Sequence, residues 1–361
     1  MWPSYGESRW RNDGRSRIAR WSVSPIQYRK RLRMTRFSLG LLNQLRVYWF
    51  LLGLALVVTI GLVGHSPLQT LTQFSWLMSG LAFAVMAMMA APIPLEMVRQ
   101  TVGRPWPAVL ASMINLAVVP LLGWVASQWL PLELAGGLIV ASAVPSTLTS
   151  AAVLARKAGG DDSVCIFATL ITNISCVVIT PFWMIVLLGV SVQLSMLDMI
   201  ANLSLIVLLP IAMVQLLRYR SQKFCRLADR SRIQLSVLCQ LGILIMVLMG
   251  SVQMGVRWSS QESQGRPIEV WQVVIVIFLG LLVHLAAFYI SWVVARRTGI
   301  SRTQAKAVSF SGSQKTLMIG LNLAIQCGVN ILPMVTYHIF QLVVDAIIAE
   351  KWSRQEKTSK N

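Results

Sequence analysis

A polar stretch that could hold an ion or a charged solute lies inside an apolar run near the C-terminus. Its groups stand on consecutive residues: Ser311, Gly312, Ser313, Gln314, Lys315 and Thr316. The interior of a bilayer cannot hydrogen-bond such groups, so they are tolerated there only against protein or a water-filled cavity. A lysine at mid-bilayer costs about 2.5–3.5 kcal/mol on insertion scales, which makes it a functional candidate. Lys315 is therefore the first residue to explain.

A second polar stretch interrupts an earlier apolar run and contains Pro145, Ser146, Thr147, Thr149 and Ser150. Pro145 removes a backbone donor and clashes with the preceding turn, and Gly312 gives the later stretch the freedom to unwind. Helices opened at such points expose carbonyl oxygens and half-helix ends, which can hold a cation or an anionic group. In the alternative interpretation, Ser and Thr bond back to their own helices and Pro145 only kinks a packed span. The presence of both stretches favours a binding site.

Other polar residues inside the apolar runs are few, and the candidates among them are Asn115, Thr169, Asn173 and Asp345. Asn115 and Asn173 either add ligands to the site or form hydrogen bonds between helices. The apolar runs that contain Lys315 and Asp345 each have one end without basic residues. The two residues lie at similar distances along the helix from these ends, so we expect them at similar depth in the membrane. That depth predicts an ion pair or a shared water between the two side chains. The alternative places Asp345 at the cytoplasmic interface.

The composition is that of a membrane protein. Hydrophobic residues make up 55% of the chain and charged residues only 12%, whereas about a quarter of an ordinary globular chain is charged. The mean hydropathy is +0.65. Because each membrane span needs roughly 20 apolar residues, these values predict a multi-pass integral membrane protein. We expect it in the plasma membrane.

Several classes of function find no support in the sequence. The formal net charge of +19 lies in the tails and in alternate loops, which is a topology pattern, so we expect no nucleic-acid partner. The five cysteines lack metal-ligand spacing, and we interpret them, with His284 and His338, as packing residues rather than metal ligands or a proton relay. Motifs for ATP-driven pumping or zinc chemistry are absent. We expect no enzyme, and no cofactor other than sodium or a proton as coupling ion.

Ten apolar runs follow one another along the chain: 47–64, 72–95, 107–130, 134–155, 163–189, 199–217, 233–253, 269–294, 303–327 and 330–349. Every even-numbered run ends in a basic segment, and the odd-numbered runs end in segments nearly free of positive charge. The positive-inside rule then places both termini in the cytoplasm. Ten spans with both ends on one side divide into two inverted halves of five. The fourth span of each half carries an interruption, which points to the binding site in inverted-repeat transporters.

The predicted fold is an all-α polytopic membrane protein. Its ten transmembrane helices form two inverted five-helix repeats in which helices 4 and 9 are discontinuous and cross. We expect a basic cytoplasmic tail at 1–46, a ten-helix domain at 47–350 and a basic cytoplasmic tail at 351–361. For the first tail, disorder is favoured. The alternatives are an arm on anionic lipid, worth on the order of 1 kcal/mol per basic residue, an Arg-rich transit peptide, or a true start at Met34.

The two polar stretches resemble the bile acid:sodium symporter family, and the resemblance covers about residues 47–350. It rests on Val144-Pro145-Ser146-Thr147, Ala158-Gly159-Gly160, Thr169 to Asn173, Thr180-Pro181 and, above all, Phe310-Ser311-Gly312-Ser313-Gln314-Lys315-Thr316. The Ser-Gln-Lys-Thr form looks like a divergent branch that includes the seventh human member and a fungal regulator of calcium uptake. The resemblance implies a core domain, where the fourth and ninth helices cross, and a panel domain built from spans 1, 2, 6 and 7.

This chain departs from sodium-coupled members of that family at expected ion ligands. The resemblance puts Phe310 where those members have a sodium-binding glutamate, and Lys315 directly after the retained Gln314. The remaining candidate sodium ligands are Asn115, Ser150, Thr169 and Gln314. At an effective dielectric of about 20, an ammonium about 4 Å from a cation repels it by on the order of 4 kcal/mol. Lys315 therefore either replaces a bound cation permanently or competes with one by releasing its proton.

Together these observations predict a secondary transporter that moves an anionic small molecule or ion by alternating access. Its coupling is to protons, weakly to sodium, or absent. The predicted ligand residues belong to the two polar stretches and to Asn115, Thr169, Asn173 and Asp345. The alternative is a non-transporting membrane regulator of ion homeostasis, which keeps the carrier fold and acts through its basic tail.

Overall fold

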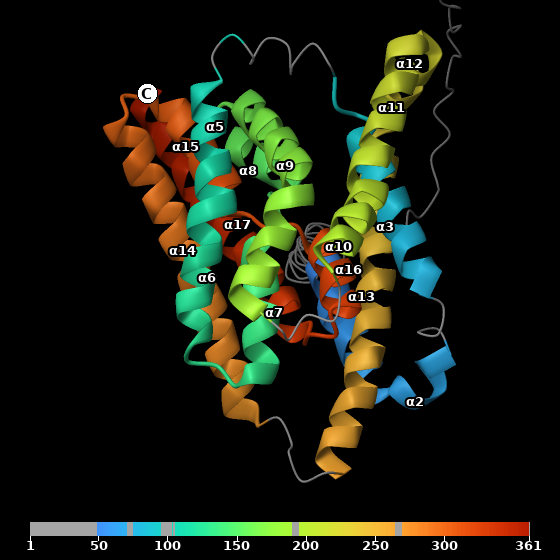
Figure 1. The fold of residues 1–361 in the computed structure, drawn as a ribbon. Helices are drawn as coiled ribbons and strands as arrows, with labels where there is room; N and C mark the ends of the chain where they lie inside the picture. Colours follow the sequence, from blue (N-terminus) through green and yellow to red (C-terminus); the bar gives the residue numbers. More distant parts are fainter. Residues whose placement is uncertain are drawn as a thin grey trace, which may run out of the picture. The chain divides into compact units, whose positions relative to one another are not determined.

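The computed structural model describes residues 49–70, 75–94, 103, 105–189, 195–263 and 269–360. Every regular element within these residues is helical (Figure 1). Six of the helices are long and apolar enough to cross a membrane: Trp106–Ser127, Asp162–Leu188, Met196–Arg220, Arg232–Ser259, Val270–Arg297 and Leu332–Glu356. Shorter apolar helices are Trp49–Val63, Trp76–Ala90 and Leu134–Ala143. The segment 1–46, expected to be a disordered tail, lies outside the described residues.

After the helix Trp49–Val63, the labelled elements follow in chain order. They are α2 His65–Leu68, α3 Ser75–Ala90, α5 Trp106–Met113, the π-helical η2 Ile114–Val118, α6 Val119–Ser127, α7 Leu132–Ala143, α8 Ser150–Lys157, α9 Asp162–Leu188, α10 Met196–Leu203, the π-helical η4 Ser204–Leu208, α11 Leu209–Arg220, α12 Gln222–Arg230, α13 Arg232–Ser263, α14 Val270–Arg297, α15 Arg302–Ser313, α16 Leu317–Gln326 and α17 Leu332–Lys360. Both π-helical segments continue directly into α-helices.

The two helices expected to be discontinuous are discontinuous. Residues 144–149 separate α7 from α8, and residues 314–316 separate α15 from α16. Val144 is extended, with φ −73° and ψ 159°, because the ring of Pro145 disfavours helical backbone in the preceding residue. Gln314 is also extended, with φ −72° and ψ 144°. Each interruption therefore replaces less than about two helical turns by open backbone.

Gly312 does not supply the freedom to unwind that the sequence suggested. It lies inside α15, before the interruption. A Cβ atom at this position would lie 2.5 Å from Ser291 Oγ on α14. Small residues let helices approach closely in membrane proteins. The missing side chain of Gly312 therefore serves the packing of α15 against α14, and the expected role is wrong.

The helices pack in two groups. In the first, α14 packs against α15, α17 and α6, and α5, α8 and α9 pack against α15. Fully buried alanines at these contacts, such as Ala108, Ala151 and Ala305, allow the close approach. In the second, α3 packs against α13 and α11, on the other side of the view in Figure 1. The half-helix α16 contacts α17 of the first group and α13 of the second and so joins the two groups.

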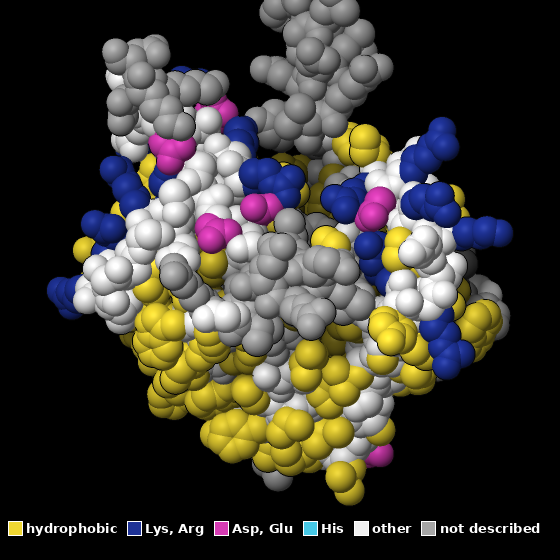
Figure 2. Space-filling model, turned by 90° about the horizontal axis from the view of Figure 1, so that it is seen from above, with side chains coloured by type: hydrophobic (Ala, Val, Ile, Leu, Met, Phe, Trp, Pro, Cys, Tyr) yellow, Lys and Arg dark blue, Asp and Glu magenta, His cyan; other side chains and the backbone are white. Residues whose placement is uncertain are grey.

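One end of the molecule is rich in basic side chains. Figure 1 shows α12 and the C-terminus at this end, and Figure 2, which looks onto it, shows many Lys and Arg side chains there. The last helix, α17, runs from Leu332 to Lys360, so it continues past the predicted end of the tenth run at 349. Residues 351–360, expected to form a tail, are therefore part of that helix.

Candidate functional site

The interruptions of the two discontinuous helices meet. The Thr316 N–H donates to Pro145 O at 2.9 Å, and Lys315 Nζ donates to Val144 O at 2.9 Å. Gln314 is 0% exposed and Lys315 1% exposed. Backbone groups that an interrupted helix leaves open must find partners when no water reaches them. Here each interruption supplies partners for the other.

Lys315 places its ammonium group among three oxygen atoms. Besides Val144 O, the Nζ atom lies 2.6 Å from Asn115 O and 3.2 Å from Asn115 Oδ1. An ammonium has three N–H donors and no acceptor, so these three oxygens satisfy it. The Nζ atom of Lys315 is thus buried and held by neutral oxygens of Asn115 and Val144.

The carbonyl oxygen of Asn115 is available to Lys315 because η2 changes the backbone hydrogen bonding of its own helix. The Val119 N–H bonds back to Ile114 O, and Pro120, the next residue, has no N–H to donate. The side-chain amide of Asn115 points to the open end of α15. There Nδ2 donates to Ser311 O at 3.1 Å, Gly312 O at 3.3 Å and Gln314 O at 2.8 Å. The carbonyl groups left over at the end of α15 are therefore bonded to an amide nitrogen.

Gln314 joins the first interruption to α17. Its Oε1 accepts hydrogen bonds from Thr147 Oγ1 at 2.6 Å and Ser150 Oγ at 2.8 Å. Its Nε2 donates to Asp345 Oδ2 at 2.6 Å. Hydroxyl groups donate to the amide oxygen and a carboxylate accepts from the amide nitrogen, so both sets of contacts require the same orientation of the Gln314 side-chain amide.

Asp345 pairs with His284 and not with Lys315. Its Oδ1 lies 3.0 Å from His284 Nε2, and the carboxylate is 0% exposed. No ion pair joins Asp345 to Lys315 within the described part of the chain, so the predicted ion pair is wrong, whereas the shared water stays a prediction. The fully buried carboxylate does not fit the alternative of an interfacial position. Successive side chains of an extended segment point to opposite sides. Gln314 therefore faces Asp345, while Lys315 faces Asn115.

Two residues of α17 that the sequence interpretation did not assign to the site bind the backbone of Lys315. Gln341 Oε1 accepts from the Lys315 N–H at 2.9 Å, and Gln341 Nε2 donates to Lys315 O at 2.8 Å. His338 Nδ1 lies 3.2 Å from the same carbonyl oxygen. His338, Gln341 and Asp345 follow at helical i, i+3, i+7 spacing, so they share one face of α17. That polar stripe in an apolar run was the signal that could have found them.

The long helix α9 holds the first interruption in place. Thr169 Oγ1 donates to Thr147 O at 3.1 Å, and Asn173 Nδ2 donates to Ser146 O at 3.2 Å. Asn173 thus forms a hydrogen bond between helices, one of its two predicted roles. Its Oδ1 and the Ser146 Oγ are buried atoms without a hydrogen-bond partner. The structure brings Asn115, Ser150 and Gln314 together directly, and Thr169 joins them only through the backbone of Thr147.

The hydroxyls of Ser311 and Ser313 bond to their own helix, as in the alternative interpretation of the polar stretches. Ser311 Oγ donates to Ala307 O at 2.5 Å and Ser313 Oγ to Ser309 O at 2.8 Å, so both side chains bond back to their own helix. Their carbonyl oxygens, not their hydroxyls, face the site.

Phe310 packs its ring against Phe288 and Trp352, with centroids 5.2 and 5.9 Å away. An aromatic cluster therefore surrounds the position of the glutamate expected from sodium-coupled proteins.

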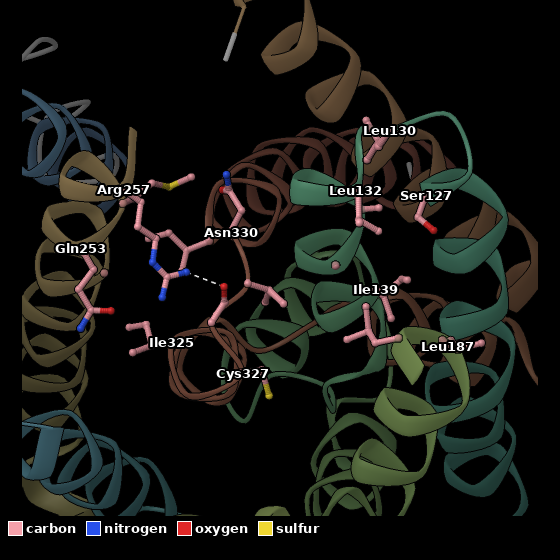
Figure 3. A pocket seen from close by; sticks show the side chains of 18 of the residues that line it. Ser127, Leu130, Leu132, Ile139, Leu187, Gln253, Arg257, Ile325, Cys327 and Asn330 are labelled. Carbon is pink, nitrogen blue, oxygen red and sulfur yellow. Dashed lines mark hydrogen bonds between the residues drawn. The ribbon is translucent and has the colours of Figure 1, made fainter. Parts of the chain in front are cut away.

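Two cavities lie along α13 and are lined in part by its residues. The first, which we call the site cavity, has a volume of about 180 Å³ and is lined by Thr147, Thr149, Ser150, Thr316 and His338 on one side and by α13 residues from Arg232 to Ile243 on the other. The second, which we call the turn cavity, has a volume of about 470 Å³ and is lined by α13 residues from Gly250 to Trp258 and by the turn between α16 and α17. Figure 3 shows the turn cavity. The described residues contain no group of three or more His, Cys, Asp or Glu that could hold a metal ion.

The described structure is that of an all-helical polytopic membrane protein, because several of its helices are long enough to cross a membrane. Its two interrupted helices meet around buried polar groups, an arrangement typical of secondary transporters. The chain belongs to the SBF-like CPA transporter family, whose model matches residues 48–354. The family resemblance seen in the sequence is thereby confirmed.

Several curated relatives carry transporter names. The chain is 22% identical over 337 residues to sodium/bile acid cotransporter 7 of Xenopus tropicalis, covering 86% of this chain and 93% of that protein. It is 24% identical over 246 residues to the probable chloroplastic sodium/metabolite cotransporter BASS4 of Arabidopsis thaliana, covering 64% of this chain and 55% of that protein. The match therefore spans about half the length of the plant protein. An uncharacterized protein of Pseudomonas aeruginosa is 26% identical over 256 residues, covering 68% of this chain and 73% of that protein.

Proposed function

We propose that the protein is a secondary transporter that moves an anionic solute across the membrane by alternating access. The observation that carries this proposal is that Lys315 is buried where the two interruptions meet. Thr147, Ser150 and Thr316 of the same interruptions line the site cavity. An intramembrane cation attracts an anionic solute. The site and turn cavities border different stretches of α13, as expected if one site is reached from either side in turn.

The transport topology we propose has ten spans in two inverted halves. The spans are Trp49–Val63, α3, α5 to α6, α7 with α8, α9, α10 to α11, α13, α14, α15 with α16, and α17. The interrupted helices are then the fourth of each half, and the group of α3, α11 and α13 corresponds to the panel. The basic end in Figure 2 faces the cytoplasm under the positive-inside rule. Both termini lie on that side, and the membrane is the plasma membrane.

We further propose that Lys315 stands in for a coupling cation, so that sodium coupling is weak or absent although the relatives' names include sodium. Three observations support this. Nζ already occupies oxygens of Asn115 and Val144, the amide of Asn115 donates to carbonyl oxygens of α15, and Phe310 lies in an aromatic cluster. Of the candidate sodium ligands, Asn115 and Gln314 thus accept hydrogen bonds from protein donors in this conformation, whereas the hydroxyls of Ser150 and Thr169 donate. Coupling is then to protons, weakly to sodium, or absent.

Uptake in proteoliposomes tests the transport proposal. A stabilisation screen across organic and inorganic anions selects the solutes, and their uptake is measured with a sodium gradient, a proton gradient or neither. We expect uptake that Lys315→Met abolishes and the exposed control Arg297→Gln preserves. Uptake by Lys315→Met at the wild-type rate would contradict the proposed role of the site.

A non-transporting regulator remains the second candidate, because every N–H of Lys315 is satisfied by protein oxygens. In that case Lys315 is a structural tie. A regulator would show no gradient-dependent uptake of any stabilising anion, and its effect on ion homeostasis in cells would survive Gln314→Ala but not removal of residues 1–33.

A further inference from the structure

The helix α12 links two helices that are long and apolar enough to cross a membrane, and the proposed transport makes no use of it. Only Ser221 separates α12 from α11, and only Ser231 separates it from α13. Figure 1 shows α12 at the basic end of the molecule. Because both of its ends are attached to helices of membrane length, α12 lies at or beside the headgroup region of a bilayer.

One face of α12 packs on the protein and the opposite face is exposed. Ala228 is buried, and Phe224 and Cys225 are half-buried. Cys225 Sγ donates to Arg218 O at 3.0 Å, which ties this inner face to α11. The opposite face carries exposed side chains at i, i+3, i+4 and i+7 spacing. We call it the basic face, and it consists of Lys223, Arg226, Leu227 and Arg230.

The acid of α12 is already paired within the protein. Asp229 Oδ1 lies 2.9 Å from Arg232 Nη2 and 3.4 Å from Arg218 Nη1. Arg218 is buried and also donates to Ala91 O at 2.7 Å. None of the ion pairs in the described part of the chain includes a cation of the basic face. The three cations of that face therefore remain available to an anionic partner.

Exposed apolar side chains accompany these cations. Leu227 of the basic face is 62% exposed, Tyr219 near the end of α11 is 81% exposed and Ile233 near the start of α13 is 78% exposed. A soluble anion would neutralise the cations but leave these three side chains in water. A lipid interface accepts both kinds of group, since tyrosine is enriched there and helices that combine Lys and Arg with apolar residues bind in its plane.

We propose that the basic face of α12 binds the headgroups of anionic phospholipids. The phosphate oxygens accept charge-assisted hydrogen bonds from Lys223, Arg226 and Arg230, and Leu227 enters the boundary between headgroups and acyl chains. Each basic residue near an anionic surface contributes about fivefold in affinity. The hairpin of α11, α12 and α13 is thereby anchored at the membrane surface. This binding goes beyond the proposed transport and does not depend on it.

Native mass spectrometry of the purified full chain in detergent measures this binding. Dioleoylphosphatidylglycerol is compared with dioleoylphosphatidylcholine, which has the same acyl chains and no net charge. Glycerol phosphate supplies the anionic group without acyl chains, and a short polyglutamate peptide represents an acidic protein partner. We expect phosphatidylglycerol to bind at least about tenfold more tightly than each of the other three probes.

Variants of the basic face test its part in the binding. Lys223→Gln, Arg226→Gln and Arg230→Gln together should weaken phosphatidylglycerol binding at least about tenfold and leave phosphatidylcholine binding unchanged. Arg226→Lys with Arg230→Lys keeps the charge and should bind the lipid within about threefold of wild type, which separates loss of the cations from misfolding. Leu227→Ser should weaken binding by a smaller factor than the triple change.

The matched control removes three exposed cations from other helices, by Arg296→Gln, Arg297→Gln and Lys351→Gln together. It should change phosphatidylglycerol binding less than about threefold. An equal loss in the control and in the basic-face variant would show that net charge alone attracts the lipid and would overturn the inference. Equal binding of the two lipids, or polyglutamate binding as tight as that of phosphatidylglycerol, would also overturn it.

Discussion

At the scale of single residues, the site is a chain of hydrogen bonds in which each group has a defined role. Lys315 donates to neutral oxygens, and Gln314 accepts from hydroxyls and donates to Asp345. His284 completes the shell of that carboxylate. The cation and the carboxylate are therefore separated by an amide, so neither neutralises the other by direct contact. Such fully buried networks couple their members strongly.

The bond between Gln314 and Asp345 gives the first prediction. Gln314→Glu places a second acid against Asp345 and removes the donor, so it should destabilise the protein and reduce uptake. Asp345→Asn alone leaves His284 without an anionic partner. Combined, the two changes exchange amide and acid and restore a hydrogen bond. A double-mutant cycle on unfolding free energy should show a favourable coupling of about 1–3 kcal/mol. Additive effects of the two substitutions would be inconsistent with the bond.

At the scale of helices, the sequence was informative about where the chain opens and less so about what holds it open. Pro145 and the polar run that ends at Thr316 predicted the two interruptions, because both signals are local. The pairing of Asp345 with His284 and the release of the Asn115 carbonyl by η2 were not predictable, because they depend on how distant helices rotate against one another. The same holds for Gly312, whose neighbour Ser291 is on another helix.

The contact of α15 with α14 gives the second prediction. Gly312→Ala puts a methyl group 2.5 Å from Ser291 Oγ, so it should cost about 1–3 kcal/mol of unfolding free energy, as overpacking does. Ser291→Gly removes the obstructing side chain and should recover most of that loss when combined with Gly312→Ala. Thermal unfolding in detergent measures both. Failure of Ser291→Gly to restore stability would show that the glycine serves another purpose.

The end of α17 gives the third prediction. Lys306, whose side chain is 3% exposed, donates at 2.5 Å to Glu356, whose side chain is 38% exposed. Glu356→Ala leaves a buried ammonium with the Ala158 carbonyl as its remaining hydrogen-bond acceptor, and it should cost about 1–2 kcal/mol after allowing for the exposure of the partner. Glu350→Ala removes an acid from more exposed pairs with Lys157 and Arg354 and should leave the melting temperature nearly unchanged. Equal effects of the two substitutions would contradict this account.

At the scale of the whole molecule, the two cavities border successive stretches of α13. The buried side chains of Met246 and Val247 lie on the stretch between them. A carrier needs such a barrier between the compartments in every state. Under the proposed topology the site cavity opens to the cytoplasm and the turn cavity to the opposite side.

Accessibility to a membrane-impermeant thiol reagent tests this arrangement. In a background without the five native cysteines, Gln240→Cys in the site cavity should react from the cytoplasmic side, and Gln253→Cys in the turn cavity from the other side. Labelling of both positions from the same side only would contradict the proposed topology and the separate openings of the cavities.

In the function that we propose, the ammonium of Lys315 stands where a coupling cation would bind. Binding of radioactive sodium to the purified protein tests it most directly, with Lys315→Asn as the comparison and Lys351→Asn, an exposed position, as the control. We expect weak or unsaturable sodium binding by the wild type and by Lys351→Asn, and saturable binding once Lys315 is replaced. Saturable sodium binding by the wild type with the affinity of Lys315→Asn would contradict it.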